Sequence, residues 1–307
     1  MRYRVTKGLI RVCDDESRGT LMPVRVVTDS TSYIRPEHAE ELGITLVSLG
    51  VVFGDESFRE LDVEDDWFYE KMAATPKIPT SSQPSPGEMR AAFESALKAG
   101  EPVVGVFISS DMSGTLGSAE LVAADLRSEY PDADIRIVDS RSNSMQLGLA
   151  AIAAAKAANA GGGADACVKA AGDTIARTRF LFTPLTLDYL RKGGRIGGAS
   201  AFLGSLLQIR PILTVEDGQT QAFDKVRTRT RAIERMIEKL SEDHKDAGIT
   251  DVYVHHINAK DLGEHLVSLV QPLVDCPVGL APIGPVIGLH VGPGTVALVY
   301  RTRDPLR

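Results

Sequence analysis

Residues 85–108 read SPGEMRAAFESALKAGEPVVGVFI, a helix signal followed at once by a strand signal. Ser85 and Glu88 have the spacing of a capping box, Pro86 takes the first helical position, and apolar residues then recur at helical spacing. The apolar run at 102–108 is too short for a helix and is typical of a strand buried on both faces. This stretch predicts a helix that packs on a parallel sheet.

The same alternation of strands and helices extends outward from this stretch. Further candidate strands lie at 24–28, 44–52 and 134–138. An alanine-rich helix is expected over 144–160, and Gly161-Gly162-Gly163 ends it. Such βαβ units predict an α/β domain over residues 24–178, with a mainly parallel sheet and flanking helices.

The second half of the chain has a different pattern. Asp217-Gly218 separates two β-rich runs, and this dipeptide is a strong hairpin signal. Later apolar runs around 285–289 and 295–300 flank a glycine-rich turn. Residues 179–307 are therefore predicted to form an α+β domain with a mixed or antiparallel sheet, and a ligand site is expected between the two domains.

Composition narrows the class of protein. A chain of 307 residues exceeds the usual size of one hydrophobic core, so two domains are expected. The net charge of −7 argues against sequence-independent binding of nucleic acid. Cys13, Cys167 and Cys276 are few, odd in number and far apart in the sequence, so neither a disulfide framework nor a zinc knuckle is indicated, which fits a reducing cytoplasm. No apolar run reaches membrane-spanning length. Residues 1–23 lack periodicity and are expected to form a poorly defined arm.

Two hydroxyl-rich stretches are candidates for binding an anion, PTSSQPS at 79–85 and ISSDMSGT at 108–115. Both are expected as loops at strand ends, where free N–H groups and a helix dipole favour an anion and the hydroxyls suit a carboxylate. The alternative is that the hydroxyls only cap helices and close turns. A nucleophilic role is the weaker interpretation, because Ser113 lacks the first glycine of Gly-x-Ser-x-Gly.

Basic residues occur in two glycine-rich stretches. Arg191 and Lys192 are explained as complements to a helix C-terminus, whereas the glycines around Arg195 allow a ligand to approach closely. His290 lies in a stretch rich in glycine and proline, so a loop histidine at a polar site is expected. Motifs for nucleotides and metals are absent, so no cofactor and no metal is predicted.

Taken in order, these residues resemble the DegV family over nearly the whole chain from Val24. The resemblance is carried by VTDS (27–30), SSQPS (81–85), SGT (113–115), VDS (138–140), LRKGGRI (190–196), KVR (225–227) and GLHVGPG (288–294). Some members of that family are fatty-acid-binding subunits of a bacterial fatty acid kinase. The resemblance implies two α/β domains that enclose a lipid, and a carrier subunit rather than an enzyme.

The resemblance also implies roles for individual residues. The ligand site is expected to contain Ser81, Ser113, Thr80, Ser82, Gly114, Thr115, Arg195, Arg227 and His290. Ser81, with Thr80 as the alternative, and Ser113 are implied to bind the carboxylate. The basic residues of the site are implied to lie near the carboxylate exit, where a partner kinase would place a phosphoryl group. Candidates for the tunnel lining are Phe202, Leu203, Leu206 and Leu207.

The leading hypothesis is therefore a cytoplasmic carrier of a long-chain fatty acid, which it presents to a separate kinase for acyl-phosphate formation. Each buried methylene is worth roughly 0.8 kcal/mol, so the acyl tail is expected to supply most of the affinity. An enzyme acting on a small phosphorylated or carboxylated polyol, with His290 as acid or base, is the first alternative. A ligand-sensing regulator is the second.

Overall fold

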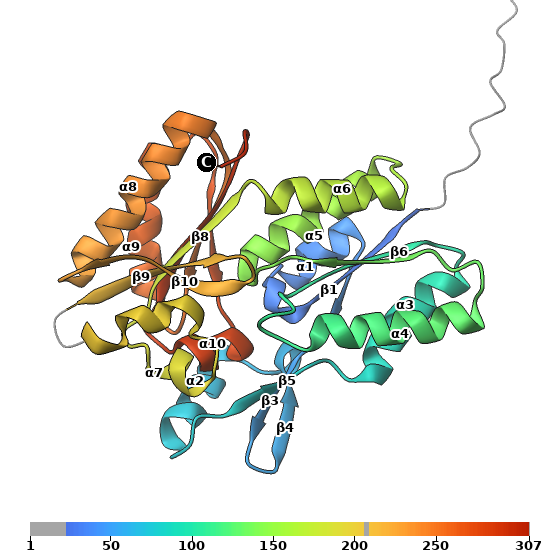
Figure 1. The fold of residues 1–307 in the computed structure, drawn as a ribbon, viewed down its shortest axis with the longest axis horizontal. Helices are drawn as coiled ribbons and strands as arrows, with labels where there is room; N and C mark the ends of the chain where they lie inside the picture. Colours follow the sequence, from blue (N-terminus) through green and yellow to red (C-terminus); the bar gives the residue numbers. More distant parts are fainter. Residues whose placement is uncertain (1–22, 206–208, 307) are drawn as a thin grey trace, which may run out of the picture.

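The computed structural model describes residues 23–205 and 209–306, so the arm predicted for 1–23 lies outside the described residues except for Pro23. The strands of this part of the chain form three sheets. Figure 1 shows the two larger sheets side by side, with the small three-stranded sheet at one end of the molecule. Helix α5 (Ser144–Asn159) packs against strands of both larger sheets.

The first large sheet is parallel throughout, with strand order β2-β1-β6-β7. Its strands are β1 (Arg25–Asp29), β2 (Ile44–Val47), β6 (Val103–Phe107) and β7 (Ile135–Asp139). The helices that cover it are α1 (Pro36–Leu42), α3 (Pro86–Lys98), α4 (Thr115–Glu129), α5 and α6 (Ala164–Ile175). Val27 and Phe107 pack toward α3 and α4, whereas Val26 and Val104 pack toward α1, α5 and α6. The predicted parallel sheet with flanking helices is confirmed.

Helix α3 begins as its sequence predicts. The Ser85 hydroxyl accepts a hydrogen bond from the Glu88 backbone N–H at 3.1 Å, and Pro86 occupies the first turn. Met89 and Phe93 are completely buried. The cap and the apolar stripe together direct α3 onto the sheet.

The prediction of one strand over residues 44–52 is wrong, because the segment divides into β2 and β3, which belong to different sheets. Side chains take the backbone hydrogen bonds at the break. The Ser48 N–H donates to the Glu88 carboxylate at 2.9 Å, and the Leu49 N–H donates to the Ser30 hydroxyl at 3.0 Å. Because these N–H groups bond to side chains, the chain leaves the parallel sheet here.

The small sheet is antiparallel and has the order β4-β3-β5. It consists of β3 (Gly50–Phe53), β4 (Glu56–Arg59) and β5 (Thr80–Ser82), and helix α2 (Asp65–Ala74) lies between β4 and β5 in the chain. The loop predicted at 80–82 is therefore a short strand. It is extended because it pairs with β3, a partner that is distant in sequence.

The second large sheet is mixed, with the order β10-β9-β8-β13-β11-β12. Its strands are β8 (Thr178–Thr183), β9 (Arg210–Glu216), β10 (Gln219–Val226), β11 (Ile249–His256), β12 (Val278–Pro282) and β13 (Val296–Thr302). Its helices are α7 (Asp188–Lys192), α8 (Arg229–Ala247), α9 (Lys260–Val270) and α10 (Pro285–Val291). The hairpin predicted at Asp217-Gly218 is confirmed, with φ of 50° and 79° at its two central residues.

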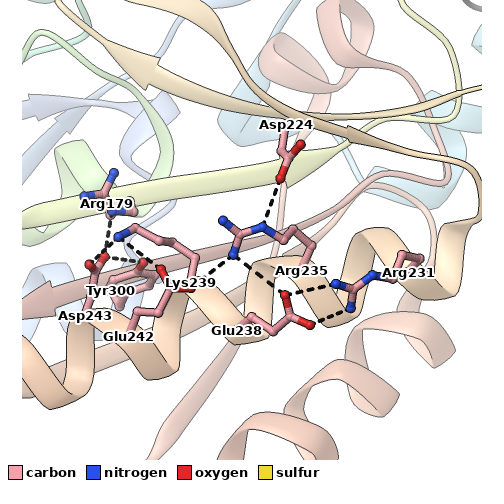
Figure 2. Close-up of polar contacts among 9 residues, drawn as sticks. All are labelled: Arg179, Asp224, Arg231, Arg235, Glu238, Lys239, Glu242, Asp243 and Tyr300. Carbon is pink, nitrogen blue, oxygen red and sulfur yellow. Dashed lines mark hydrogen bonds and ion pairs between the residues drawn. The ribbon is translucent and has the colours of Figure 1, made fainter.

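A network of ion pairs holds α8 to this sheet (Figure 2). Asp243 is 5% exposed and accepts hydrogen bonds from Arg179 on β8 and Tyr300 on β13, at 2.7 and 2.8 Å. Lys239 lies 2.8 Å from the other carboxylate oxygen. Burial raises the pKa of Asp243, but the hydrogen bonds from Lys239 and Tyr300 and the Arg179 charge lower it below its ordinary value. Figure 2 also shows Arg235 reaching across to Asp224 on β10.

The apolar run at 285–289, unlike that at 295–300, forms a helix. Gly284 and Pro285 begin α10, which continues to Val291, so the prediction that His290 lies in a loop is wrong. His290 belongs to the last turn of this helix. The first turn of α10 receives its hydrogen-bond acceptors from the other half of the chain, as described below.

Candidate ligand site

A cavity of about 350 Å³ lies at the junction of the three sheets. This volume falls within the usual range for small-molecule sites. Apolar lining residues include Leu49, Ile108, Phe180, Val215, Ile257 and Ile287. Because they come from both halves of the chain, the cavity exists only when the two halves pack together.

The polar residues of the cavity are linked by a series of contacts. The Ser81 hydroxyl lies 2.9 Å from the Nε2 atom of His290. A Cβ added at Gly193 would overlap the His290 ring, so the ring packs directly on the α7 C-terminus. Two residues later, the Arg195 guanidinium donates to the Met112 carbonyl at 3.0 Å, which places Arg195 beside the 108–115 loop.

The 108–115 loop completes this polar group. Ser113 and Gly114 line the cavity, and the Gln83 side chain lies so close to Gly114 that a Cβ there would clash with it. The Ser113 hydroxyl accepts from the Thr115 N–H at 3.3 Å and lies 2.9 Å from the Thr115 hydroxyl. As predicted, the loop follows a parallel strand, β6, and opens a helix, α4.

The cavity histidine is neutral. Burial, aided by the Arg195 charge, lowers the pKa of His290 to about 4, so the imidazole carries no charge near neutral pH. A neutral imidazole can donate from one ring nitrogen and accept at the other. The His290 Nδ1 atom is buried and has no hydrogen-bond partner in the described part of the chain.

A second cavity, of about 550 Å³, shares Ser81, Arg195 and His290 with the first. Lys77 and Lys192 also line it. The shared residues therefore separate an apolar cavity from a basic one. An anion held at the shared residues would face the apolar wall on one side and these cations on the other.

The structure separates the hydroxyls of β5. Ser81 is half-buried and lines both cavities, whereas Thr80 is exposed and lines only the basic one. Ser82 lines the apolar cavity. Thr115 is completely buried and does not line either cavity.

Some residues predicted for the site lie elsewhere. Arg227 is exposed just after β10 and does not line either cavity. Phe202 and Leu203, expected in the tunnel lining, are absent from the apolar wall, and Leu203 is 36% exposed. Their segment belongs to the 3-10 helix Gly197–Ser205. Leu206 and Leu207 lie outside the described residues.

Sequence reasoning missed several lining residues. Asn143, at the start of α5, and Thr295, before β13, both face the apolar cavity. Neither stands in a motif, so no local signal marks them. Gln83 lies within the hydroxyl-rich stretch that was singled out, and its contact with Gly114 shows that the two predicted stretches meet.

Two further features bear on the chemistry of the site. Within residues 23–205 and 209–306, no group of three His, Cys, Asp or Glu side chains is arranged to hold a metal ion. Over the same residues, no helix has both the length and the apolar character needed to cross a bilayer.

Comparison with known proteins agrees with the fold. A family model described as "Uncharacterised protein, DegV family" matches residues 23–303. A DegV domain-containing protein of Clostridium acetobutylicum is 46% identical over 93% of this chain and 100% of its own length.

Solved structures of similar proteins share the whole fold. A DegV family protein of Thermus thermophilus, described as binding fatty acid, superposes with a TM-score of 0.84 at 29% identity, over 92% of this chain and 100% of its own. DegV of Bacillus subtilis, described as a fatty acid binding protein, has a TM-score of 0.81 at 31% identity, over 92% and 99% of the two chains. From the extent of these matches, the chain belongs to the DegV family.

Proposed function

We propose that this protein binds a long-chain fatty acid, with the acyl tail in the apolar cavity and the carboxylate at Ser81, Ser113 and His290. The observation that carries the proposal is the composition of the cavity, which is apolar over most of its wall and polar at these residues. The fatty-acid-binding relatives support it. Most hydroxyls of a polyol would find no hydrogen-bonding partner on this wall, so the small-polyol alternative is disfavoured.

The energetics favour such a ligand. Burial of each methylene contributes roughly 0.8 kcal/mol, so the tail supplies more free energy than any single headgroup contact. Neutral donors can hold an ionised carboxylate through charge-assisted hydrogen bonds. Arg195 contributes a positive charge at the same place without being buried.

We further propose that the protein is a carrier and not a hydrolase. Ser81 and His290 are within hydrogen-bonding distance, as a nucleophile and its base would be. In a catalytic triad, however, an acidic side chain orients the second ring nitrogen of the histidine. The Nδ1 atom of His290 has no such partner among the described residues.

The basic cavity suggests how the bound carboxylate is used. Lys77, Lys192 and Arg195 lie beside the residues proposed to hold the carboxylate. Cations there would favour approach of a phosphoryl donor. We therefore propose that a separate kinase phosphorylates the bound fatty acid and that the protein then carries the acyl phosphate.

Mass spectrometry of lipids extracted from the purified protein, followed by titration of delipidated protein with oleate, tests fatty acid binding. We expect a stoichiometric acyl ligand and weaker binding of oleyl alcohol, which lacks the carboxylate. A protein that neither contains nor takes up an acyl chain would rule the proposal out.

Kinase presentation is tested separately, with a bacterial fatty acid kinase catalytic subunit, ATP and labelled oleate on the carrier. Lys192→Ala should slow acyl-phosphate formation while oleate affinity stays unchanged. Asp188→Ala, on the same short helix, is the matched control. The absence of any acyl phosphate with the wild-type carrier would contradict presentation but not binding.

A further inference from the structure

Helix α10 forms one wall of the cavity but contains only seven residues. It contributes Val286, Ile287 and Val291 to the apolar lining, and His290 to the polar end. A helix this short is not stable by itself. Its position must therefore be set by groups outside it.

A carboxylate from the first half of the chain caps this helix. Glu60, in the 3-10 helix Glu60–Asp62, accepts from the Val286 N–H through Oε1 at 2.8 Å. The Tyr33 hydroxyl donates to the same oxygen at 3.0 Å. The Tyr33 hydroxyl also accepts a hydrogen bond from the Ile287 N–H at 3.2 Å. Gly284, at the N-cap, has no side chain to serve this purpose, so Glu60 and Tyr33 take over the capping role.

The other oxygen of Glu60 connects to a second part of the cavity wall. Ser30 donates to Oε2 at 2.5 Å and accepts from the Leu49 N–H at 3.0 Å. Leu49 lines the cavity, whereas Glu60 does not. One buried carboxylate, 5% exposed, thus links two elements of the wall without contacting the cavity.

We propose that Glu60 is a positioning residue for the ligand site, because its carboxylate and Tyr33 together hold α10 where His290 meets Ser81. The consequence for ligand affinity rests on the proposed fatty acid function. The structural part does not, since the His290–Ser81 contact exists without a ligand. The two parts are therefore tested by different measurements.

The first measurement is an NMR titration of the His290 imidazole in delipidated protein. In Glu60→Ala the first turn of α10 loses its cap, so His290 should become more hydrated and its titration midpoint should rise toward 6.5, the ordinary value. Glu60→Gln keeps an acceptor oxygen for Val286 and should restore a titration close to wild type.

Asp243→Ala is the matched control, because it also removes a buried carboxylate, whose partners are Arg179, Lys239 and Tyr300 and not residues of α10. It should lower stability without moving the His290 titration. If Glu60→Ala does not fold, Tyr33→Phe, which removes the acceptor for Ile287, should show the upward shift. An unchanged titration in folded Glu60→Ala or in Tyr33→Phe, or an equal shift in Asp243→Ala, would overturn the proposal.

The second measurement is a double-mutant cycle for oleate affinity. If Glu60 acts through His290, Glu60→Ala should weaken binding about tenfold in the wild-type background and by less than about twofold in a His290→Gln background. Equal losses in both backgrounds would overturn the positioning role. Failure of the wild-type protein to bind any fatty acid would instead count against the proposed function and leave the titration result standing.

Discussion

Replacing Ser81 by alanine should weaken fatty acid binding, whereas the same replacement at Thr80 should leave it nearly unchanged. Ser81 lines the apolar cavity next to His290, whereas Thr80 is exposed and lines only the basic cavity. A direct contact with a carboxylate in the apolar cavity is therefore open to Ser81 and not to Thr80.

The expected size of the effect follows from the bonds that Ser81 makes before and after binding. A hydrogen bond to a charged group contributes roughly 1.5–3 kcal/mol, which corresponds to about a tenfold to hundredfold change in Kd. In the ligand-free protein Ser81 already bonds to His290 at 2.9 Å, so the alanine variant also loses a contact before binding. This loss raises the free energy of the unbound state and reduces the net effect to about tenfold.

Calorimetric titration of delipidated protein with oleate and with oleyl alcohol measures this effect. Ser81→Ala should lose affinity for oleate and little for the alcohol, because the alcohol has no charge to stabilise. Ser113→Ala should behave like Ser81→Ala, and Thr80→Ala should match wild type. A variant set in which Thr80→Ala weakens oleate binding while Ser81→Ala does not would refute the assignment.

Three other perturbations test separate features. Ala297→Leu adds bulk to the cavity wall from β13, so it should weaken stearate binding more than laurate binding in a displacement assay, and equal losses would contradict a tail site there. Burial raises the pKa of Glu60 to about 7 from 4.5, with Asp29 and Tyr33 facing it, so folded protein holds more protons than unfolded protein between these values. The unfolding free energy of the protein should therefore fall by roughly 3 kcal/mol as pH rises through this window. Urea unfolding of Glu60→Gln should show no such decrease from this residue. Asp243→Asn leaves half-buried Arg179 without its counter-charge and should lower the unfolding free energy by roughly 3 kcal/mol, whereas an unchanged melting temperature would show that the network contributes little.

The elements that sequence reasoning predicted well are those whose causes are local. The start of α3 is determined by Ser85, Pro86 and Glu88, all within four positions. The β9–β10 hairpin depends on Asp217-Gly218, whose positive φ values allow a tight turn. In both cases a few adjacent residues supply the hydrogen bonds or the backbone freedom that the structure needs.

The elements that were predicted wrongly depend on distant partners. The 285–289 run is apolar and short, a pattern that fits a buried strand as well as a helix. What makes it helical is a proline at the first position and acceptors from Glu60 and Tyr33, more than two hundred residues earlier. In the same way, Thr80–Ser82 is extended because it pairs with β3, and no pattern in the neighbouring sequence predicts that pairing.

The residue types of the site have local signals in the sequence, whereas its geometry depends on contacts between distant segments. Ser81 and Ser113 could be predicted because they lie in hydroxyl-rich stretches, and Arg195 and His290 because they lie among glycines. Their arrangement in space could not be predicted, because it depends on contacts among β5, the 108–115 loop and α10, which are distant from one another in the sequence. Buried Glu60 holds α10 in place without touching the cavity. The effects of substitutions at Glu60 and His290 on ligand affinity should therefore be non-additive, although only His290 is proposed to contact the ligand.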